Sequence, residues 1–214
     1  MLTRRHFVVT SAMALAAAQS GPLLAQEVLT VASLVPVAPV APEIPAITLP
    51  PTVEGSFEIP ERYQARIVQV RPEFVANQIH ILPATYNLYF TLGGGQAIRY
   101  GVAVGKEGLL WRGQGSIQRK VEWPNWTPTP EMIERSPEHY EQYKDGMPGG
   151  PGNPLGARAM YVFQGNVDTA IRVHGTILPA SIGSSASNGC FRMYNSHVID
   201  LYDRVQLGTT LFAY

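Results

Sequence analysis

The chain contains a single cysteine, Cys190, and a histidine, His174, lies sixteen residues before it. A thiol becomes a good nucleophile when a neighbouring imidazole takes its proton and holds the thiolate as an ion pair. Glycines at positions 175, 183 and 189 allow the chain to leave a strand, turn and return, which would bring Cys190 beside His174. The pair predicts nucleophilic catalysis, although most single cysteines are small buried hydrophobic residues.

Two residues flanking the cysteine have properties that suit such a site. Gly189 has no Cβ, so a substrate can approach the backbone closely and adjacent N–H groups can point at a developing oxyanion. Arg192 would lie on the same side as Cys190 if residues 190–193 are extended. Its guanidinium could bind a substrate carboxylate or form a salt bridge inside the domain, and the sequence leaves both open.

Around these residues the sequence resembles a known enzyme family. His174-Gly175-Thr176, followed by Ser187-Asn188-Gly189-Cys190-Phe191-Arg192-Met193, is similar to the signature of the YkuD-type L,D-transpeptidases, the ErfK/YbiS/YcfS/YnhG-like enzymes that remodel bacterial peptidoglycan. Residues 153–159 and the segment after Arg192 are also similar, so the resemblance covers roughly residues 62–214. Many members carry a second histidine where this chain has Asn188, and an amide cannot carry a proton.

The resemblance implies an activity and residue roles. Cys190 would attack a peptidoglycan stem tetrapeptide, forming a thioester acyl-enzyme with loss of D-alanine, and His174 would be oriented by the Gly175 carbonyl. An amine would then resolve the thioester in a 3→3 cross-link, a protein attachment or an exchange of D-amino acids, whereas water would give L,D-carboxypeptidation. The implied partners are peptidoglycan stem peptides, with no cofactor and no metal, and the oligomeric state stays open. The implied substrate-binding residues are Arg192, Asn188, Ser187 and Gly189.

Three other functions are possible interpretations of these histidines and the cysteine. A sortase-like cysteine transpeptidase would place its histidine and cysteine on well-separated strands rather than sixteen residues apart. A non-catalytic wall-binding protein of the same fold would keep these residues without turnover. A zinc hydrolase would use His80, His139 and His174, but the sequence has no H-E-x-x-H or paired-cysteine spacing.

The first 25 residues are typical of an export signal. Arg4 and Arg5 followed by Phe7, an alanine-rich apolar run and small residues ending at Ala25 resemble a twin-arginine signal. The apolar run is shorter than the roughly 20 residues of a membrane span, so we expect cleavage, no stable span afterwards, and a periplasmic protein. One cysteine leaves no intramolecular disulfide partner in that oxidising compartment.

The next segment, residues 26–61, is predicted to be a proline-rich linker. Seven prolines between positions 36 and 60 exclude a helix and an interior strand. They favour a polyproline-like tether, with a segment packed along the domain surface as the alternative. The whole chain has sixteen basic and sixteen acidic residues, which gives no electrostatic case for nucleic-acid binding.

Residues 62–214 predict one mostly β catalytic domain, like a β-sandwich or barrel, with a few short helices. Short β-branched and aromatic runs predict strands over 65–70, 78–82, 86–92, 97–104, 116–121, 159–163, 171–174 and 209–213. His174 therefore ends a strand. Helices are expected after Thr129, over 138–144, and after Asn195, where Thr129 and Asn195 would be N-caps.

Several polar and aromatic residues of this domain have two interpretations. Trp123 and Trp126, fixed among prolines, would form one wall of a substrate cleft or complete the core. His197 and Asp200 lie one turn apart on the last helix, where exposed surface positions are the more common explanation for such a pair.

Overall fold

The computed structural model describes residues 47 and 57–214, so the predicted export signal lies outside the described residues. Three described residues of the predicted linker contact the domain. Ile47 packs against the main hydrophobic core, and Phe57 and Ile59 pack against a smaller cluster that contains Tyr63 and Tyr194. At these residues the proline-rich segment follows the domain surface, which was the alternative to a free tether.

Within the described residues, nine strands form one mixed sheet, and all of them except β10 lie on runs that the sequence predicted as strands. The spatial order is β1-β4-β3-β2-β11-β6-β7-β8-β10, and a second sheet pairs β5 with β9 in parallel. The strands are β1 (Arg66–Gln69), β2 (Ile79–Leu82), β3 (Asn87–Gly93), β4 (Gln96–Gly101), β5 (Val104–Gly105), β6 (Gly113–Glu122), β7 (Arg158–Gln164), β8 (Val167–His174), β9 (Ser185–Ser187), β10 (Phe191–Arg192) and β11 (Thr210–Ala213).

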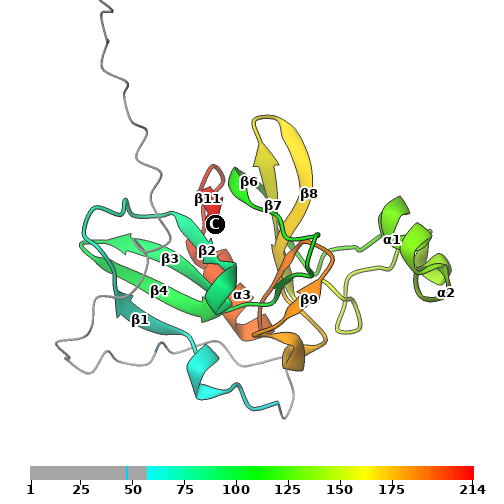
Figure 1. Ribbon diagram of the computed structural model, residues 1–214, viewed down its shortest axis with the longest axis horizontal. Coiled ribbons are helices and arrows are strands. Elements are labelled where there is room, and N and C mark those ends of the chain that lie inside the picture. The colour runs from blue at the N-terminus through cyan, green and yellow to red at the C-terminus, as the bar shows by residue number, and fades with distance from the viewer. Residues whose placement is uncertain (1–46, 48–56) are drawn as a thin grey trace, which may run out of the picture.

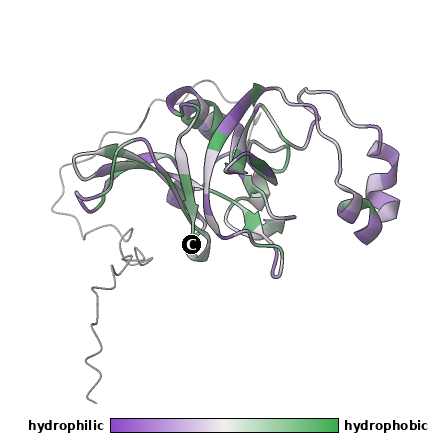
Figure 2. Cartoon of the chain, turned by 90° about the horizontal axis from the view of Figure 1, so that it is seen from above, coloured by the Kyte–Doolittle hydropathy of each residue, from purple (hydrophilic) through white to green (hydrophobic). Residues whose placement is uncertain are grey.

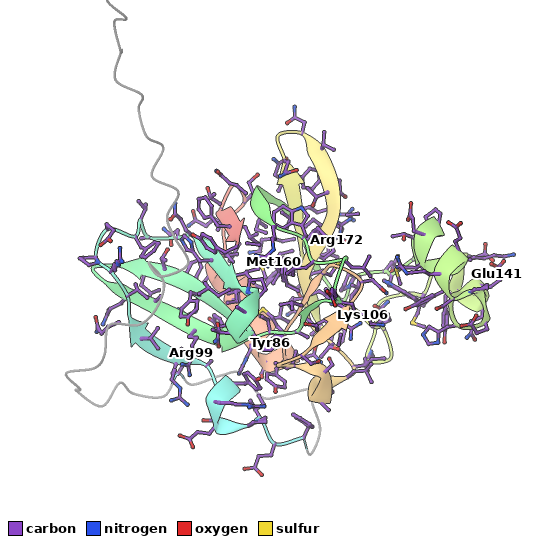
Figure 3. All side chains as sticks on the ribbon, viewed as in Figure 1. Tyr86, Arg99, Lys106, Glu141, Met160 and Arg172 are labelled. Carbon is purple, nitrogen blue, oxygen red and sulfur yellow. The ribbon has the colours of Figure 1, made fainter. Side chains whose placement is uncertain are left out.

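The sheet curls so that β10 meets the segment that follows β4, the strand next to the opposite end. β10 lies at one end, and its Arg192 exchanges two backbone hydrogen bonds of 2.9 and 3.0 Å with Ala103, just after β4. The curled sheet therefore surrounds a hydrophobic core. Met160 of β7 is one of the side chains packed inside it (Figure 3). This partial closure is the sandwich- or barrel-like architecture that the sequence predicted.

In residues 57–214, three α-helices and several single turns connect the strands. Thr129 caps α1 (Pro130–Arg135) by accepting a hydrogen bond from the backbone N–H of Met132 at 3.3 Å, as expected. The helix expected over 138–144 is divided into α2 (Pro137–Tyr140) and the 3-10 turn η4 (Glu141–Tyr143), and α3 (Asn195–Arg204) follows β10. The other turns are η2 (Glu61–Tyr63), η3 (Pro83–Thr85) and η5 (Pro179–Ser181).

The segment with α1 and α2 projects from the side of the domain near β7 and β8 (Figure 1). Its helices are mostly hydrophilic, in contrast to the apolar interior of the sheet (Figure 2), and no residue of α1 or α2 is fully buried. It is thus an insertion between β6 and β7 rather than part of the core.

Within the part of the chain that the structure describes, no helix has the length and apolarity that a membrane crossing requires.

Two predictions about the last helix were wrong. The N-cap of α3 is Tyr194, and the side chain of Asn195 turns inward instead of capping the helix. His197 is fully buried and Asp200 is 9% exposed, so neither is a surface residue. Asp200 accepts a hydrogen bond from the hydroxyl of Tyr100 and forms a salt bridge of 2.7 Å with Arg204, which explains why a carboxylate is tolerated there.

Candidate active site

A pocket of about 400 Å³ opens between the end of β8, the loop before β10 and the inserted helices. Cys190, His174 and Arg192 line one side of it. Aromatic and sulfur-containing side chains of the insertion line the other, namely Trp126, Met132, Tyr140, Tyr143 and Met147. The structure thus brings the lone cysteine and the histidine into one cavity, with an apolar wall opposite them.

The pairing of β8 with β10 places these residues. The two strands are parallel, with Phe191 opposite Val173 and Arg192 opposite His174, so Cys190 enters the sheet beside the strand that ends in the histidine. Gly189 directly before it has φ +125°, a conformation that side chains rarely adopt. A Cβ there would also lie 3.1 Å from the Leu109 carbonyl oxygen, so the turn into β10 requires glycine.

The imidazole of His174 is held by the next residue. Its Nδ1 lies 2.6 Å from the carbonyl oxygen of Gly175, and because a carbonyl only accepts, Nδ1 must carry the proton. Nε2 is then the basic nitrogen. Burial, and after it the positive charge of Arg192, lowers the pKa of His174 to about 3, so the imidazole is neutral above that pH.

The thiol of Cys190 is oriented by backbone groups of β8. Its Sγ lies 3.7 Å from the carbonyl oxygen of Ala170, the acceptor of its hydrogen bond. Burial raises the pKa of the thiol, while the backbone N–H and the guanidinium of Arg172 act in the opposite direction. Both shifts favour a neutral thiol and a neutral imidazole at rest over the ion pair that we expected from the sequence.

Ser187 and Gly189 support the nucleophile loop from within. The Ser187 hydroxyl donates to the carbonyl oxygen of Cys190 and accepts a 3.2 Å hydrogen bond from the Gly189 N–H. That N–H is thus engaged by the Ser187 hydroxyl, and the oxyanion role expected of the adjacent N–H groups stays a prediction.

Asn188 and Arg192 face the pocket. The amide of Asn188 donates to the Tyr140 hydroxyl at 3.2 Å, and its oxygen accepts from Arg135 at 3.4 Å, so Asn188 joins the loop to the insertion. Within the described residues, no carboxylate lies within salt-bridge distance of Arg192. The internal salt bridge considered for this arginine is therefore not formed, and its charge is available to a bound anion.

The two tryptophans lie in different environments. Trp126 lines the pocket, with its ring 6.2 Å from that of Tyr140 and 5.8 Å from that of Tyr143. Trp123 is 37% exposed and does not line the pocket. The predicted cleft-wall position thus fits Trp126 but not Trp123, and neither indole is buried in the core.

Asn195 is a supporting residue that sequence reasoning missed. Its Oδ1 accepts hydrogen bonds from the backbone N–H groups of Ala157 and Thr176 at 3.0 and 3.3 Å, and its amide donates to the Thr176 carbonyl at 2.8 Å. It therefore fixes the segment directly after His174. The helical period that places Val198 and Val205 on the buried face also places Asn195 there, and this was the available signal.

The histidines of the zinc alternative are not gathered into a metal site. His80 lies on β2, where it hydrogen-bonds the Tyr214 hydroxyl at 2.9 Å and Gln78 at 3.3 Å, away from the pocket. His139 does line the pocket with His174. Across residues 47 and 57–214, no three His, Cys, Asp or Glu side chains are arranged to hold a metal ion.

Comparison with known proteins is consistent with this geometry. The sequence pattern of the YkuD family, the L,D-transpeptidase catalytic domain, matches residues 76–212, which is more than half of the chain. A protein of Fuscovulum blasticum named "Putative L,D-transpeptidase in ATP synthase subunits region ORF 5" is 40% identical over 103 residues, covering 47% of this chain and 49% of its own length. The chain spans about half or less of the length of the curated relatives it matches.

Two crystal structures are also similar. One, described as a probable carnitine operon oxidoreductase from Brucella melitensis, is 54% identical, with a TM-score of 0.51 over 73% of this chain and 96% of that one. The other, an L,D-transpeptidase variant from Enterococcus faecium, is 16% identical, with a TM-score of 0.50 over 70% of this chain and 56% of that one, and shows the fold alone.

The redox activity in the first description differs from the family assignment. We give more weight to the family pattern, because it spans both Cys190 and His174 and the pocket presents this thiol and imidazole together. The sequence match, the mostly β fold and the resemblance around the lone cysteine agree: the chain belongs to the YkuD family of L,D-transpeptidase catalytic domains.

Proposed function

We propose that this chain transfers peptidoglycan stem peptides through a thioester on Cys190. His174 Nε2 takes the thiol proton as the sulfur attacks the amide carbonyl carbon of the diamino acid in position three. The C–N bond to D-alanine then breaks, and the same nitrogen returns the proton to the leaving amine. An acceptor amine attacks the thioester, loses its proton to His174, and releases the thiol.

The observation that carries the proposal is the tautomer of His174. The 2.6 Å contact from Nδ1 to the Gly175 carbonyl leaves Nε2 unprotonated at neutral pH, in the same pocket as the thiol. A base of this kind can accept the thiol proton during attack without a preformed thiolate. Among the described residues Arg192 has no carboxylate partner, so its guanidinium suits the carboxylates of a stem peptide.

Intact-mass measurement tests the proposal. Incubation with a disaccharide tetrapeptide and an amine acceptor should give the acyl-enzyme and the transfer product, and a carbapenem should add one adduct to the wild type. Cys190→Ala, which removes the sulfur and keeps the Cβ, should give neither. Release of D-alanine without transfer to any amine would instead indicate an L,D-carboxypeptidase. A folded wild type with no adduct from either reagent would indicate a wall-binding protein and refute the proposal.

We further propose that the protein is exported to the periplasm by the twin-arginine route. Substrates of this kind lie outside the cytoplasmic membrane, and Arg4 and Arg5 provide the paired guanidinium groups. Changing both to lysine keeps the charge but removes the guanidinium geometry, so a twin-arginine receptor should fail and a general secretion signal should not. Normal periplasmic levels of the double-lysine variant would refute this route.

A further inference from the structure

Strand β8 leaves its regular pairing directly beside the nucleophile. Its partners on β7 are Tyr161 for Arg172 and Phe163 for Asp168, so residues 169–171 of β8 lie opposite Val162 alone. In the middle of this bulge, Ala170 has φ +60°, which is uncommon for a residue with a side chain. Bulges beside active sites commonly redirect a side chain or backbone group.

Asp168 and Arg172 clamp the two ends of the bulge. Their side chains form a two-pronged ion pair, with N···O distances of 2.6 and 2.9 Å, and Asp168 Oδ1 also accepts the Ala170 N–H at 2.9 Å. Arg172 is packed in turn over the ring of Tyr161 at 4.1 Å. Figure 3 shows Arg172 on β8 at the side of the sheet. The left-handed conformation of Ala170 is therefore held by the Asp168 carboxylate, which Arg172 fixes in place.

A threonine fixes the interior of the same bulge. The hydroxyl of Thr169 donates to the Val162 carbonyl at 2.7 Å and accepts the Ile171 N–H at 3.2 Å, which satisfies groups that regular pairing would have joined. The result is that the Ala170 carbonyl faces the sulfur of Cys190 at 3.7 Å. Non-glycine residues in this conformation cluster at functional sites, where the surrounding structure supports the strain.

We propose that the bulge at residues 168–172 is a positioning device for the catalytic thiol, in which Asp168 and Arg172 hold the Ala170 carbonyl against Cys190 Sγ. The carbonyl accepts a hydrogen bond from the S–H, which fixes the orientation of the resting sulfur and favours its protonated form. When His174 takes the proton, the Arg172 N–H remains to stabilise the thiolate. This inference rests on the proposed transfer activity.

The charges around the sulfur give the device a signature in pH. On β8 the guanidinium of Arg172 lowers the pKa of the thiol and the carboxylate of Asp168 raises it, and on β10 Arg192 lowers it. The other titratable groups of the pocket are His174 on β8 and, from the insertion, His139, Tyr140 and Tyr143. Removing the Asp168 charge should therefore shift thiol titration toward lower pH, whereas removing the Arg172 charge should shift it upward.

The backbone conformation is tested at Ala170, whose side chain is exposed. Ala170→Val should abandon the left-handed conformation, because a β-branched residue tolerates it poorly, whereas Ala170→Gly adopts it freely and is the matched control. The valine variant should react faster than wild type with iodoacetamide at neutral pH, because the thiol loses its acceptor. It should be acylated by a carbapenem at least about 10-fold more slowly, because the sulfur is no longer aimed. The glycine variant should match wild type in both.

A second pair keeps the test valid if Ala170→Val does not fold. Asp168→Asn retains an oxygen for the Ala170 N–H but removes the charge and the second oxygen that accepts from Arg172, whereas Asp168→Leu removes the acceptor for Ala170 as well. The asparagine variant should show a thiol titration shifted to lower pH with near-normal acylation, and the leucine variant should also lose acylation by about 10-fold. Equal acylation of the two variants would overturn the proposal, as would an Ala170→Val variant that reacts like wild type with both reagents. If wild type is not acylated at all, the transfer activity fails, and the iodoacetamide profiles still test the bulge.

Discussion

Replacing His174 by asparagine distinguishes a neutral catalytic pair from an ion pair. The amide nitrogen of asparagine can take the place of Nδ1 and still donate to the Gly175 carbonyl, so the local geometry is retained. What is lost is the basic Nε2. The rate of acylation should fall by about 10²–10⁴-fold, the usual contribution of a general base.

The thiol itself should titrate almost as before in this variant. Burial raises the pKa of Cys190, and a neutral His174 carries no charge that would lower it, so the midpoint of an alkylation-rate profile against pH should move little. An ion pair would behave differently, because removal of the imidazolium would shift the midpoint upward by a unit or more. A clear upward shift in His174→Asn would therefore refute the neutral pair.

The same variant should change the acid stability of the fold. The pKa of His174 is lowered to about 3 in the folded protein, so between its unfolded value of about 6.5 and about 3 only the unfolded chain binds this proton. Stability is complete above pH 6.5 and is lost as pH falls, at roughly 1.4 kcal/mol per pH unit for this residue. Urea unfolding at several pH values should show that slope reduced by about this amount in His174→Asn, while the buried His80 and His197 contribute equally to both proteins.

Four further substitutions test the rest of the site. Cys190→Ser should be folded but inactive, because a serine hydroxyl loses its proton far less readily than a thiol, and thermal unfolding with the acylation assay will check both. Trp126→Ala should raise KM or slow acylation with little change in melting temperature, because this ring lines the pocket, and the exposed Trp123→Ala is its control and should have normal kinetics. Asn195→Ala should lower the free energy of unfolding, measured in urea, by about 1–3 kcal/mol, because it leaves buried backbone groups of Ala157 and Thr176 unpaired. An unchanged free energy of unfolding would show that Asn195 does not support the segment after His174.

Much of this protein could be predicted from local sequence. Alternation of β-branched and aromatic residues sets where strands form, and the glycines at 93–95, all with positive φ, set the turn between β3 and β4. Thr129 before Pro130 fixes the start of α1 through the chemistry of a single hydroxyl. The lone cysteine and the histidine before it identified the pocket, because their reactivity depends on residue type.

Tertiary packing decided what local patterns could not encode. Asn195 and His197 lie on a helix whose period is clear, but whether a polar residue on it faces the core or water depends on β7 and β8, which pack against it. The separation of Trp126 from Trp123 depends likewise on where the insertion folds back over the pocket.

The protonation of the catalytic pair is the sharpest difference. Residue types alone favour a thiolate and an imidazolium, because that pairing is common when both groups are solvated. In the folded chain His174 is buried and Cys190 is half-buried in the pocket, which lowers the pKa of His174 and raises that of Cys190, and Arg192 adds a positive charge beside the imidazole. Desolvation is a property of everything packed around a group, so the sequence determined which residues form the pair, and only the tertiary structure decided that the pair is neutral at rest.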